Sequence, residues 1–355
     1  MSIFNIGVST IEAPVFEGYS HDGDGMAVAV QESYDDRLAI IEAMHQIGQE
    51  EVNFKSKLRV LESSNADDYE IETLKEGFEI AMEGAFGNAI DRIKKFFADL
   101  WGKITAYFKS LVKYFDYLFK NAKDFATKYE KQLRDKDGKG DLSGFEFSLY
   151  TYTNLDEGSN KDIYNRVLSS GAGSNYVKSA NSHNLDQLKD ITQRLTSKKE
   201  DIMDDARGKL LKKSSVDSGD FAKELFGFFR NGAESASDKE KKSINSISEF
   251  INVLKTSNPT KVVEDNKKAT DKIFKEQIDN VEKVRKDISK GYDGAENKEL
   301  AMAKIQYLNK AASYMSMIQG LCSSYFNAWK SAINERNSEY KSLLLAALRY
   351  KKKDK

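Results

Sequence analysis

Few residues in this sequence have the types and spacing that catalysis or metal binding requires. The three histidines, His21, His45 and His183, lie far apart, and none belongs to a ligand pattern such as H-E-x-x-H. The single cysteine, Cys322, has no histidine nearby in the sequence, so we interpret it as a small buried hydrophobe. We interpret His45 as a packed side chain at the apolar edge of a predicted helix. The sequence therefore predicts no enzyme activity, no cofactor and no bound metal.

A short pattern around glutamate is the sharpest signal in the chain. In this pattern an aliphatic residue or alanine stands two positions before a glutamate, and glycine, alanine or serine follows it. Average residue usage predicts about one such match among the twelve glutamates of residues 1–84, but six are present. They are Glu17, Glu32, Glu42, Glu62, Glu76 and Glu83. The rest of the chain has one match, Glu157.

The same segment carries an unusual charge. Residues 1–84 contain 18 acidic and 5 basic residues, a net charge of −13, whereas the remainder contains 38 and 50, a net charge of +12. The total of −1 therefore conceals two opposed parts, and such asymmetry is typical of an arm with its own task. We interpret residues 1–83 as an acidic, flexible, propeptide-like segment with short helices.

An aliphatic residue, any residue, glutamate and then a small residue resembles the cleavage pattern of the prohead proteases of large tailed bacteriophages. An acidic leader before a basic helical body likewise resembles the internal head and virion structural proteins of such phages. The aromatic stretch RIKKFFADLWGKITAYFKSLVKYFDYLF adds to this likeness. The resemblance implies a non-enzymatic capsid component, assembled in the host cytoplasm and located in the capsid interior of the virion.

The resemblance also implies partners and sites. The partners would be the phage prohead protease, scaffold or capsid proteins, genomic DNA bound non-specifically, and further copies of the chain in a homo-oligomer. Glu83–Gly84 is the preferred scissile pair, with upstream cuts at Glu76–Gly77 and Glu62–Ser63. Cleavage would leave a basic body suited to a shell that fills with DNA. The candidate DNA-contacting residues are Lys351, Lys352 and Lys353.

Long helices account for most of the predicted structure, because the chain has only two prolines and repeated apolar spacings of three and four residues. We expect a mainly α, elongated multi-helix protein with a minor β hairpin or strand near 145–153. The expected domains are 1–83, a long aromatic amphipathic helix in 84–141, a small β or loop element in 142–175, and a helical region in 176–355. Residues 1–33 are expected to be extended or disordered. The expected helices are 34–62, 69–82, 88–134, 162–169, 184–212, 218–230, 238–256, 260–290 and 297–350.

The aromatic helix leaves alternatives open. Its wide stripe is typical of packing against other helices, but a membrane-surface helix or an oligomer interface would use the same residues. A second functional hypothesis is therefore a membrane-active or pore-forming-like helical effector that uses residues 90–129 against lipid. A third is a helical adaptor that is never processed.

Overall fold

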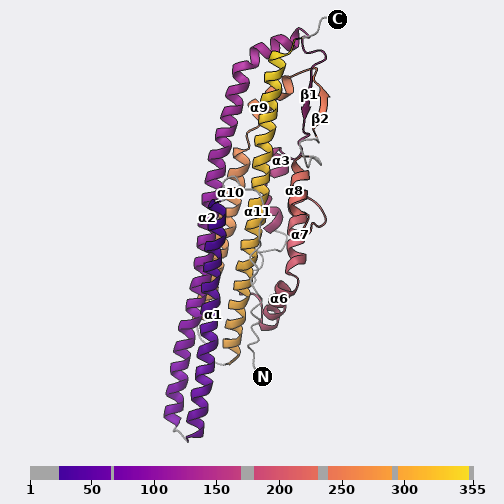
Figure 1. Ribbon diagram of the computed structural model, residues 1–355. Coiled ribbons are helices and arrows are strands. Elements are labelled where there is room, and N and C mark those ends of the chain that lie inside the picture. The colour runs from indigo at the N-terminus through magenta and orange to yellow at the C-terminus, as the bar shows by residue number, and fades with distance from the viewer. Residues whose placement is uncertain (1–23, 65–67, 169–179, 231–238, 290–294, 352–355) are drawn as a thin grey trace. The chain divides into compact units, whose positions relative to one another are not determined.

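The protein is described here from a computed structural model, which describes residues 24–64, 68–168, 180–230, 239–289 and 295–351. It is mainly α-helical with one two-stranded antiparallel sheet (Figure 1). The long helices are α1 (Asp24–Ser63), α2 (Asp68–Gly138), α10 (Thr260–Ile288) and α11 (Ala295–Arg349). The shorter elements are β1 (Glu146–Leu149), α3 (Glu157–Asn160), α4 (Ile163–Leu168), α6 (Leu185–Ser197), α7 (Lys199–Leu211), α8 (Phe221–Phe229), β2 (Glu240–Ser243) and α9 (Ser248–Thr256).

The chain divides into two compact units, and helices α2, α10 and α11 contribute residues to both. The first unit consists of Met1–Lys103, Tyr176–Thr196 and Glu276–Ser313. The second consists of Ile104–Asn175, Ser197–Lys275 and Tyr314–Lys355. Each unit has its own set of buried side chains and is described separately below.

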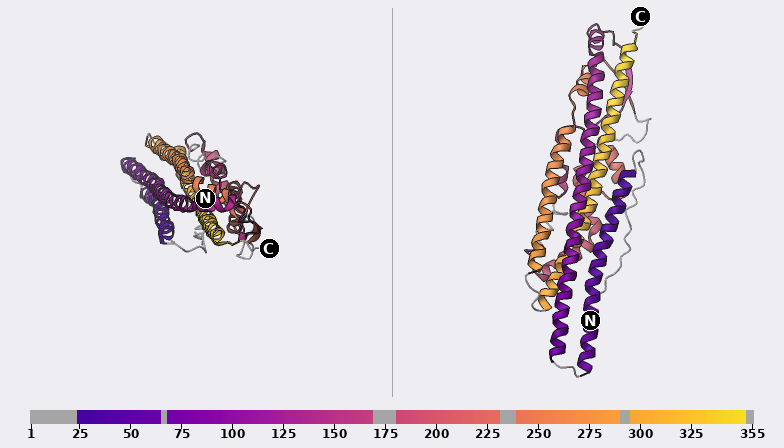
Figure 2. Two further views of the ribbon diagram at one scale, coloured as in Figure 1. Left: turned by 90° about the horizontal axis from the view of Figure 1, so that it is seen from above. Right: turned by 90° about the vertical axis from the view of Figure 1, so that its left-hand side faces the viewer.

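In the first unit, α1 runs antiparallel to the beginning of α2, as the views in Figures 1 and 2 agree. Residues 82–100 of α2 form the centre of this unit's core, because nine of their hydrophobic side chains are buried. They are Met82, Ala85, Phe86, Ala89, Ile90, Ile93, Phe96, Phe97 and Leu100. Their spacing of three and four residues places them on one broad face of the helix. The buried side chains of α1 that join this core are Ile40, Ala43 and Ile47.

Beyond this core, α1 and α2 continue as a two-helix projection. We call residues 48–64 and 68–81 the distal hairpin; none of its residues is buried. A half-buried seam joins its helices, and within it the rings of Phe54 and Phe78 stack with centroids 4.1 Å apart. The Lys298 ammonium lies 4.8 Å from the centroid of the Phe78 ring and 3.5 Å from Glu79. A seam this narrow removes far less apolar surface from water than the core face does.

The second unit is built around an aromatic cluster. Phe108 of α2 meets Tyr164 of α4 and Phe326 of α11, with ring centroids 5.7 and 5.6 Å apart. Farther along, Phe115 of α2 lies 5.1 Å from Trp329 of α11. Tilted and edge-to-face contacts at these separations add to the burial of the rings themselves. The aromatic stripe of α2 thus packs inside the protein at these positions.

The small sheet lies at the other end of this unit's core. Strand β1 pairs antiparallel with β2, with Glu146 opposite Ser243 and Leu149 opposite Glu240. Phe145, Leu149 and Ile244 join a hydrophobic cluster with α9 and the end of α11. The Lys136 ammonium donates hydrogen bonds of 2.9 Å to the carbonyl oxygens of both Ala347 and Leu348. A cation at the last turn satisfies carbonyl groups that a helix end leaves without intrahelical donors.

Several sequence-based boundaries are corrected by the structure. Residues 68–138 form one 71-residue helix, so the predicted interruption between Met82 and Asn88 is wrong. Helix α1 begins at Asp24, so the expected extended conformation of residues 24–33 is also wrong; residues 1–23 lie outside the described residues. The strand near 145–153 is confirmed, but its partner is the distant segment 240–243 and not a local hairpin. Strand β2 occupies part of the segment 238–256, for which a helix was expected.

Candidate functional site

The predicted cut at Glu62–Ser63 lies at the end of α1. Glu62, Ser63 and Ser64 are all exposed. The Ser64 amide donates to the carbonyl oxygens of Val60 and Leu61, at 3.0 and 3.2 Å, which is the last turn of the helix. Because helix ends fray at little cost, this bond can adopt the extended form that a protease binds by opening one turn.

The other two predicted cuts lie inside α2. Glu76, Gly77, Glu83 and Gly84 are exposed, but their peptide bonds belong to a continuous helix. Extending the chain around Glu83 would pull the buried Phe86 out of the core, which alone costs about 2 kcal/mol. Around Glu76 no buried side chain lies within five residues on either side. The structure thus orders the three sites by accessibility as Glu62, then Glu76, then Glu83, the reverse of the preference taken from the sequence.

The remaining matches to the glutamate pattern are less informative. Glu32 and Glu42 belong to the long helix α1, and Glu42 is exposed. Glu17 lies outside the described residues. The acidic segment therefore contains at least two long helical parts where the sequence had indicated a flexible segment with short helices. Whether it acts as a propeptide stays a prediction.

The predicted DNA-contacting lysines are only partly described. Lys351 is exposed just after α11 ends, while Lys352 and Lys353 lie outside the described residues. A larger basic surface occurs on α2 in the second unit, and we call it the lysine face. Its residues are Lys109, Lys113, Lys120, Lys123 and Lys131, all exposed. None of the five forms an ion pair with a described residue.

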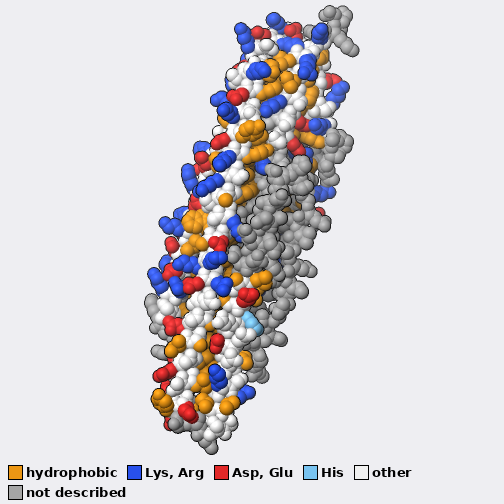
Figure 3. Space-filling view, turned by 60° about the vertical axis from the view of Figure 1, so that its left-hand side comes forward, with side chains coloured by type: hydrophobic (Ala, Val, Ile, Leu, Met, Phe, Trp, Pro, Cys, Tyr) orange, Lys and Arg blue, Asp and Glu red, His pale blue; other side chains and the backbone are white. Residues whose placement is uncertain are grey.

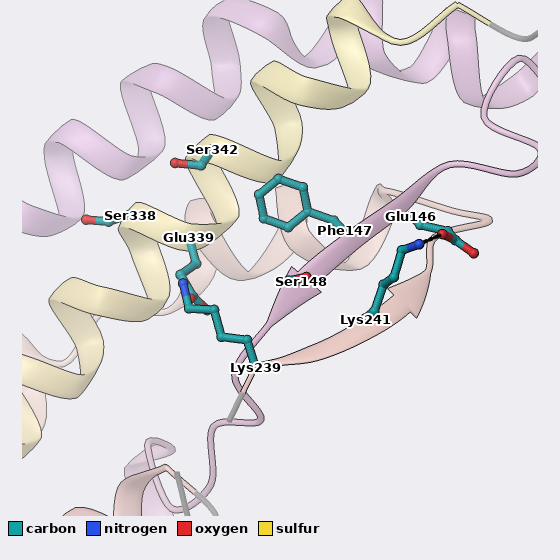
Figure 4. A pocket seen from close by; sticks show the side chains of 8 residues that line it. All are labelled: Glu146, Phe147, Ser148, Lys239, Lys241, Ser338, Glu339 and Ser342. Carbon is teal, nitrogen blue, oxygen red and sulfur yellow. Dashed lines mark ion pairs between the residues drawn. The ribbon is translucent and has the colours of Figure 1, made fainter. Parts of the chain in front are cut away.

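A depression of about 490 Å³ lies where the small sheet meets α11 (Figure 4). Phe147 and Ser148 of β1 form one side, and Ser338 and Ser342 of α11 form the other. Four charged side chains line it, and all four are used in ion pairs. The pairs are Lys239 with Glu339 and Lys241 with Glu146.

Glu339 of this depression, and Glu335 one helical turn before it, also contact groups from other elements. The backbone amide of Tyr150 donates to Glu339 Oε2 at 3.1 Å. The Arg230 guanidinium contacts Glu335 Oε2 at 2.9 Å and lies 3.2 Å from the centroid of the Phe226 ring. Burial raises the pKa of Glu335, an effect that the charge of Arg230 opposes. These contacts join β1 and β2 to α8 and α11, and they favour a structural role for the cluster.

The residues first considered for catalysis do not form a reactive group. Cys322 is buried, as the sequence indicated, and burial raises the pKa of its thiol, so the reactive thiolate is disfavoured. His45 is exposed, with its Nε2 3.0 Å from Gln49 Nε2, so the interpretation of a packed histidine is wrong. Among the described residues, no three or more His, Cys, Asp or Glu side chains are arranged to hold a metal ion.

The aromatic residues of α2 bear on the membrane hypothesis. Phe96 and Phe97 are buried in the first unit, and Phe108 and Phe115 in the second, so core packing is confirmed for these side chains. A lipid-facing use of residues 90–129 would require them to leave both cores. In the described part of the chain, no helix combines the length and the hydropathy needed to cross a membrane.

Comparison with protein-family models, with curated proteins and with solved structures found no match for this chain. The likeness to phage head proteins consequently stays a prediction that rests on residues of this sequence alone.

Two surfaces were missed from the sequence. The sequence pattern already places Lys109, Lys113 and Lys120 off the apolar stripe, and their spacing shows that they lie together on the helix, but no function was predicted for them. The distal hairpin could have been found from its exposed apolar residues only with knowledge of which helix face is covered. The exposed apolar residues of the distal hairpin are Val52, Val60, Tyr69 and Ile80.

Proposed function

We propose that this chain is a non-enzymatic structural component of a tailed-phage virion, located inside the head and matured by a prohead protease. Cleavage after an aliphatic-x-Glu site would remove acidic N-terminal residues and leave a basic helical body. The partners would be the protease, scaffold or capsid proteins, and the packaged DNA.

The observation that carries this proposal is the concentration of one glutamate pattern in the acidic segment. Six matches fall within residues 1–84, and one of them, Glu62–Ser63, coincides with the exposed end of a helix. A protease needs both a matching sequence and an accessible backbone, and the Glu62–Ser63 bond meets both requirements. We therefore place the first cut after Glu62.

A cut after Glu62 would change the charge of the protein substantially. Residues 1–62 contain 11 acidic and 4 basic residues, a net charge of −7, so the remaining chain would carry +6. A further cut after Glu83 would bring the body to +12. Each step would favour association with a polyanion, because the attraction grows with the number of uncompensated cations.

The distal hairpin supports contact with other proteins during assembly. Its described residues include eight acids and four bases, a net charge of −4. Val52, Val60, Tyr69 and Ile80 are 60 to 79% exposed on it. Exposed apolar side chains among charges are typical of a surface that a partner covers. Removing α1 after a cut at Glu62 would dismantle this surface, which would release the body from an assembly scaffold.

The N-terminus of the chain in native particles tests the proposal. We expect the mature chain to begin at Ser63, Gly77 or Gly84, as determined by N-terminal sequencing and intact mass. A chain that begins at Met1 or Ser2 in mature particles would contradict processing. Absence of the chain from purified particles would contradict the assignment to the virion.

A further inference from the structure

The lysine face is a row of exposed lysines along one helix. With 3.6 residues per turn, Lys109, Lys113, Lys120, Lys123 and Lys131 fall within an arc of about 80° on α2. At 1.5 Å per residue, the distance from Lys109 to Lys131 is about 33 Å, close to one turn of duplex DNA. Figure 3 shows Lys and Arg side chains recurring over α2, with carboxylates between them.

The cations of this face are not joined in ion pairs to described residues, although the Lys123 ammonium lies 6.0 Å from the centroid of the Phe119 ring. Several other exposed lysines of the second unit pair with carboxylates, among them Lys241 with Glu146, Lys261 with Glu157 and Lys268 with Asp265. None of the lysine-face residues forms an ion pair with a described residue. Like charges held along one rigid helix repel one another, which lowers stability. Binding of an anionic partner would reduce this repulsion between the ammonium groups.

Two carboxylates reduce the charge of the face without neutralising it. Asp116 lies inside the arc and accepts a 2.8 Å hydrogen bond from the Thr260 hydroxyl. Asp124 and Glu130 each lie about 20° beyond an edge of the arc; Asp124 is exposed, and Glu130 is already paired with Arg134 and Lys255. The face therefore retains a net charge of +3 from five cations and two anions.

We propose that the lysine face binds the phosphate backbone of duplex DNA, without reading its sequence. The proposal deepens the function proposed above, on which it rests for the nearness of packaged DNA. A row of point-charge ammonium groups one helical turn long matches a regularly spaced polyanion. Sequence readout would need arginine, asparagine or glutamine placed for bidentate contacts with bases, and the five residues are all lysine.

The surroundings of the face favour DNA over a lipid surface. A membrane-surface helix places a wide apolar face toward the lipid, with lysines at its flanks. In α2 the apolar stripe is buried, including Phe108 and Phe115, and the lysines point away from it. Tyr117, 65% exposed, is the large hydrophobic side chain on the outer side of this part of the helix.

Two matched variants of the full chain test the proposal by fluorescence anisotropy with a labelled duplex of arbitrary sequence. K113Q/K120Q/K131Q removes three charges from the lysine face, and K241Q/K261Q/K268Q removes three from elsewhere in the second unit. Five phosphate contacts predict a slope of about −4.5 for log K against log salt concentration, and the first variant should reduce its magnitude by about 2.7. At about 100 mM salt we expect at least tenfold weaker binding for the first variant and less than threefold for the second.

Rescue and competing ligands complete the test. K113R/K120R/K131R should bind like the unmodified chain, because it keeps the charges. Equal losses in both glutamine variants, no duplex binding, or tighter binding to vesicles of phosphatidylserine and phosphatidylcholine than to duplex would overturn the proposal. The N-terminus of the particle-derived chain is measured independently, so failure of the lysine face and failure of the proposed function are distinguishable.

Discussion

Residues 68–81 and residues 82–100 are consecutive stretches of the same unbroken helix, α2, but they differ sharply in burial. No side chain of the first stretch is buried, whereas nine hydrophobic side chains of the second stretch are. The first stretch packs against α1 through a single seam, with Phe78 as its largest member. The second forms the centre of the first unit's core. Secondary structure alone therefore conceals a change from a projecting hairpin to a packed helix.

This difference in burial coincides with the change from acidic to basic sequence near Glu83. The acidic segment and the basic body meet near Glu83, and the sequence predicted that the helix would be interrupted there. In the structure the helix continues, and the boundary instead marks the start of tight packing at Met82. Eight of the eighteen acidic residues thus belong to the two helical stretches of the distal hairpin, which have no buried side chain. Such helices open at lower cost than a core helix, which is a property that a removable segment requires.

The largest expected effect is a difference in how much the loss of one phenylalanine in each stretch lowers the free energy of unfolding. Phe86→Ala should lower the free energy of unfolding by about 4 kcal/mol, because Phe86 is fully buried and its loss leaves a cavity. Phe78→Ala should cost about 1.5 kcal/mol, since its ring is half-exposed and its contacts are one stacked ring and one ammonium group. Urea unfolding followed by circular dichroism measures both values. Equal losses would show that the distal hairpin is as tightly packed as the core.

A smaller effect concerns the glycines of the two stretches. Gly77 and Gly84 both lie inside α2, and a Cβ atom added at either position would meet nothing within 4 Å. Replacing either by alanine should therefore raise helix stability by about 1 kcal/mol. Gly77→Ala should slow amide hydrogen exchange mainly in residues 68–81, and Gly84→Ala should do so mainly around the start of the packed stretch. If Gly77→Ala instead protected residues 82–100, the two stretches would open as one unit.

The smallest effect depends on pH. Lys94 of the packed stretch lies 2.6 Å from Glu282 of α10, and this hydrogen bond lowers the pKa of Glu282 from its ordinary value of 4.5. Because the folded pKa lies below the unfolded one, the stabilisation is present above pH 4.5 and is lost as pH falls through the folded pKa. Since both groups are partly exposed, it amounts to about 0.5 kcal/mol. Glu282→Gln should lower the urea midpoint at neutral pH but not well below pH 4.5; a difference that persists in acid would contradict this assignment.

The sequence predicted the long helices well where apolar spacing is regular. The core positions of α2, including Ile90, Ile93 and Phe97, follow from a repeat of three and four residues, and all three are buried. The interruption near Glu83 was predicted where the sequence changes from acidic to basic and aromatic, and Gly84 and Gly87 there lower helix propensity. Burial of neighbouring Ala85 and Phe86 offsets that local cost, and a single sequence does not show which face will be covered.

The pairing of β1 with β2 and the ordering of the cleavage sites could not be predicted from the sequence, because both depend on contacts between distant parts of the chain. Strand β2 has the polar sequence EKKS, which carries no strand signal, and it forms only because β1 provides a partner from a distant part of the chain. Likewise, Glu62, Glu76 and Glu83 have similar neighbours in sequence. They differ in how much packed structure must open to expose each bond, which is a tertiary property.

The processing of single-residue variants in assembling particles tests the central claim most directly, namely that acidic residues are released at the exposed end of α1. Glu62→Gln and Glu83→Gln are matched, because each removes one exposed carboxylate from the same segment. The intact mass of the chain from assembling particles should show a product that begins at Ser63 for Glu83→Gln but not for Glu62→Gln. A full-length chain of 40.1 kDa in particles made with the unmodified sequence would contradict the account.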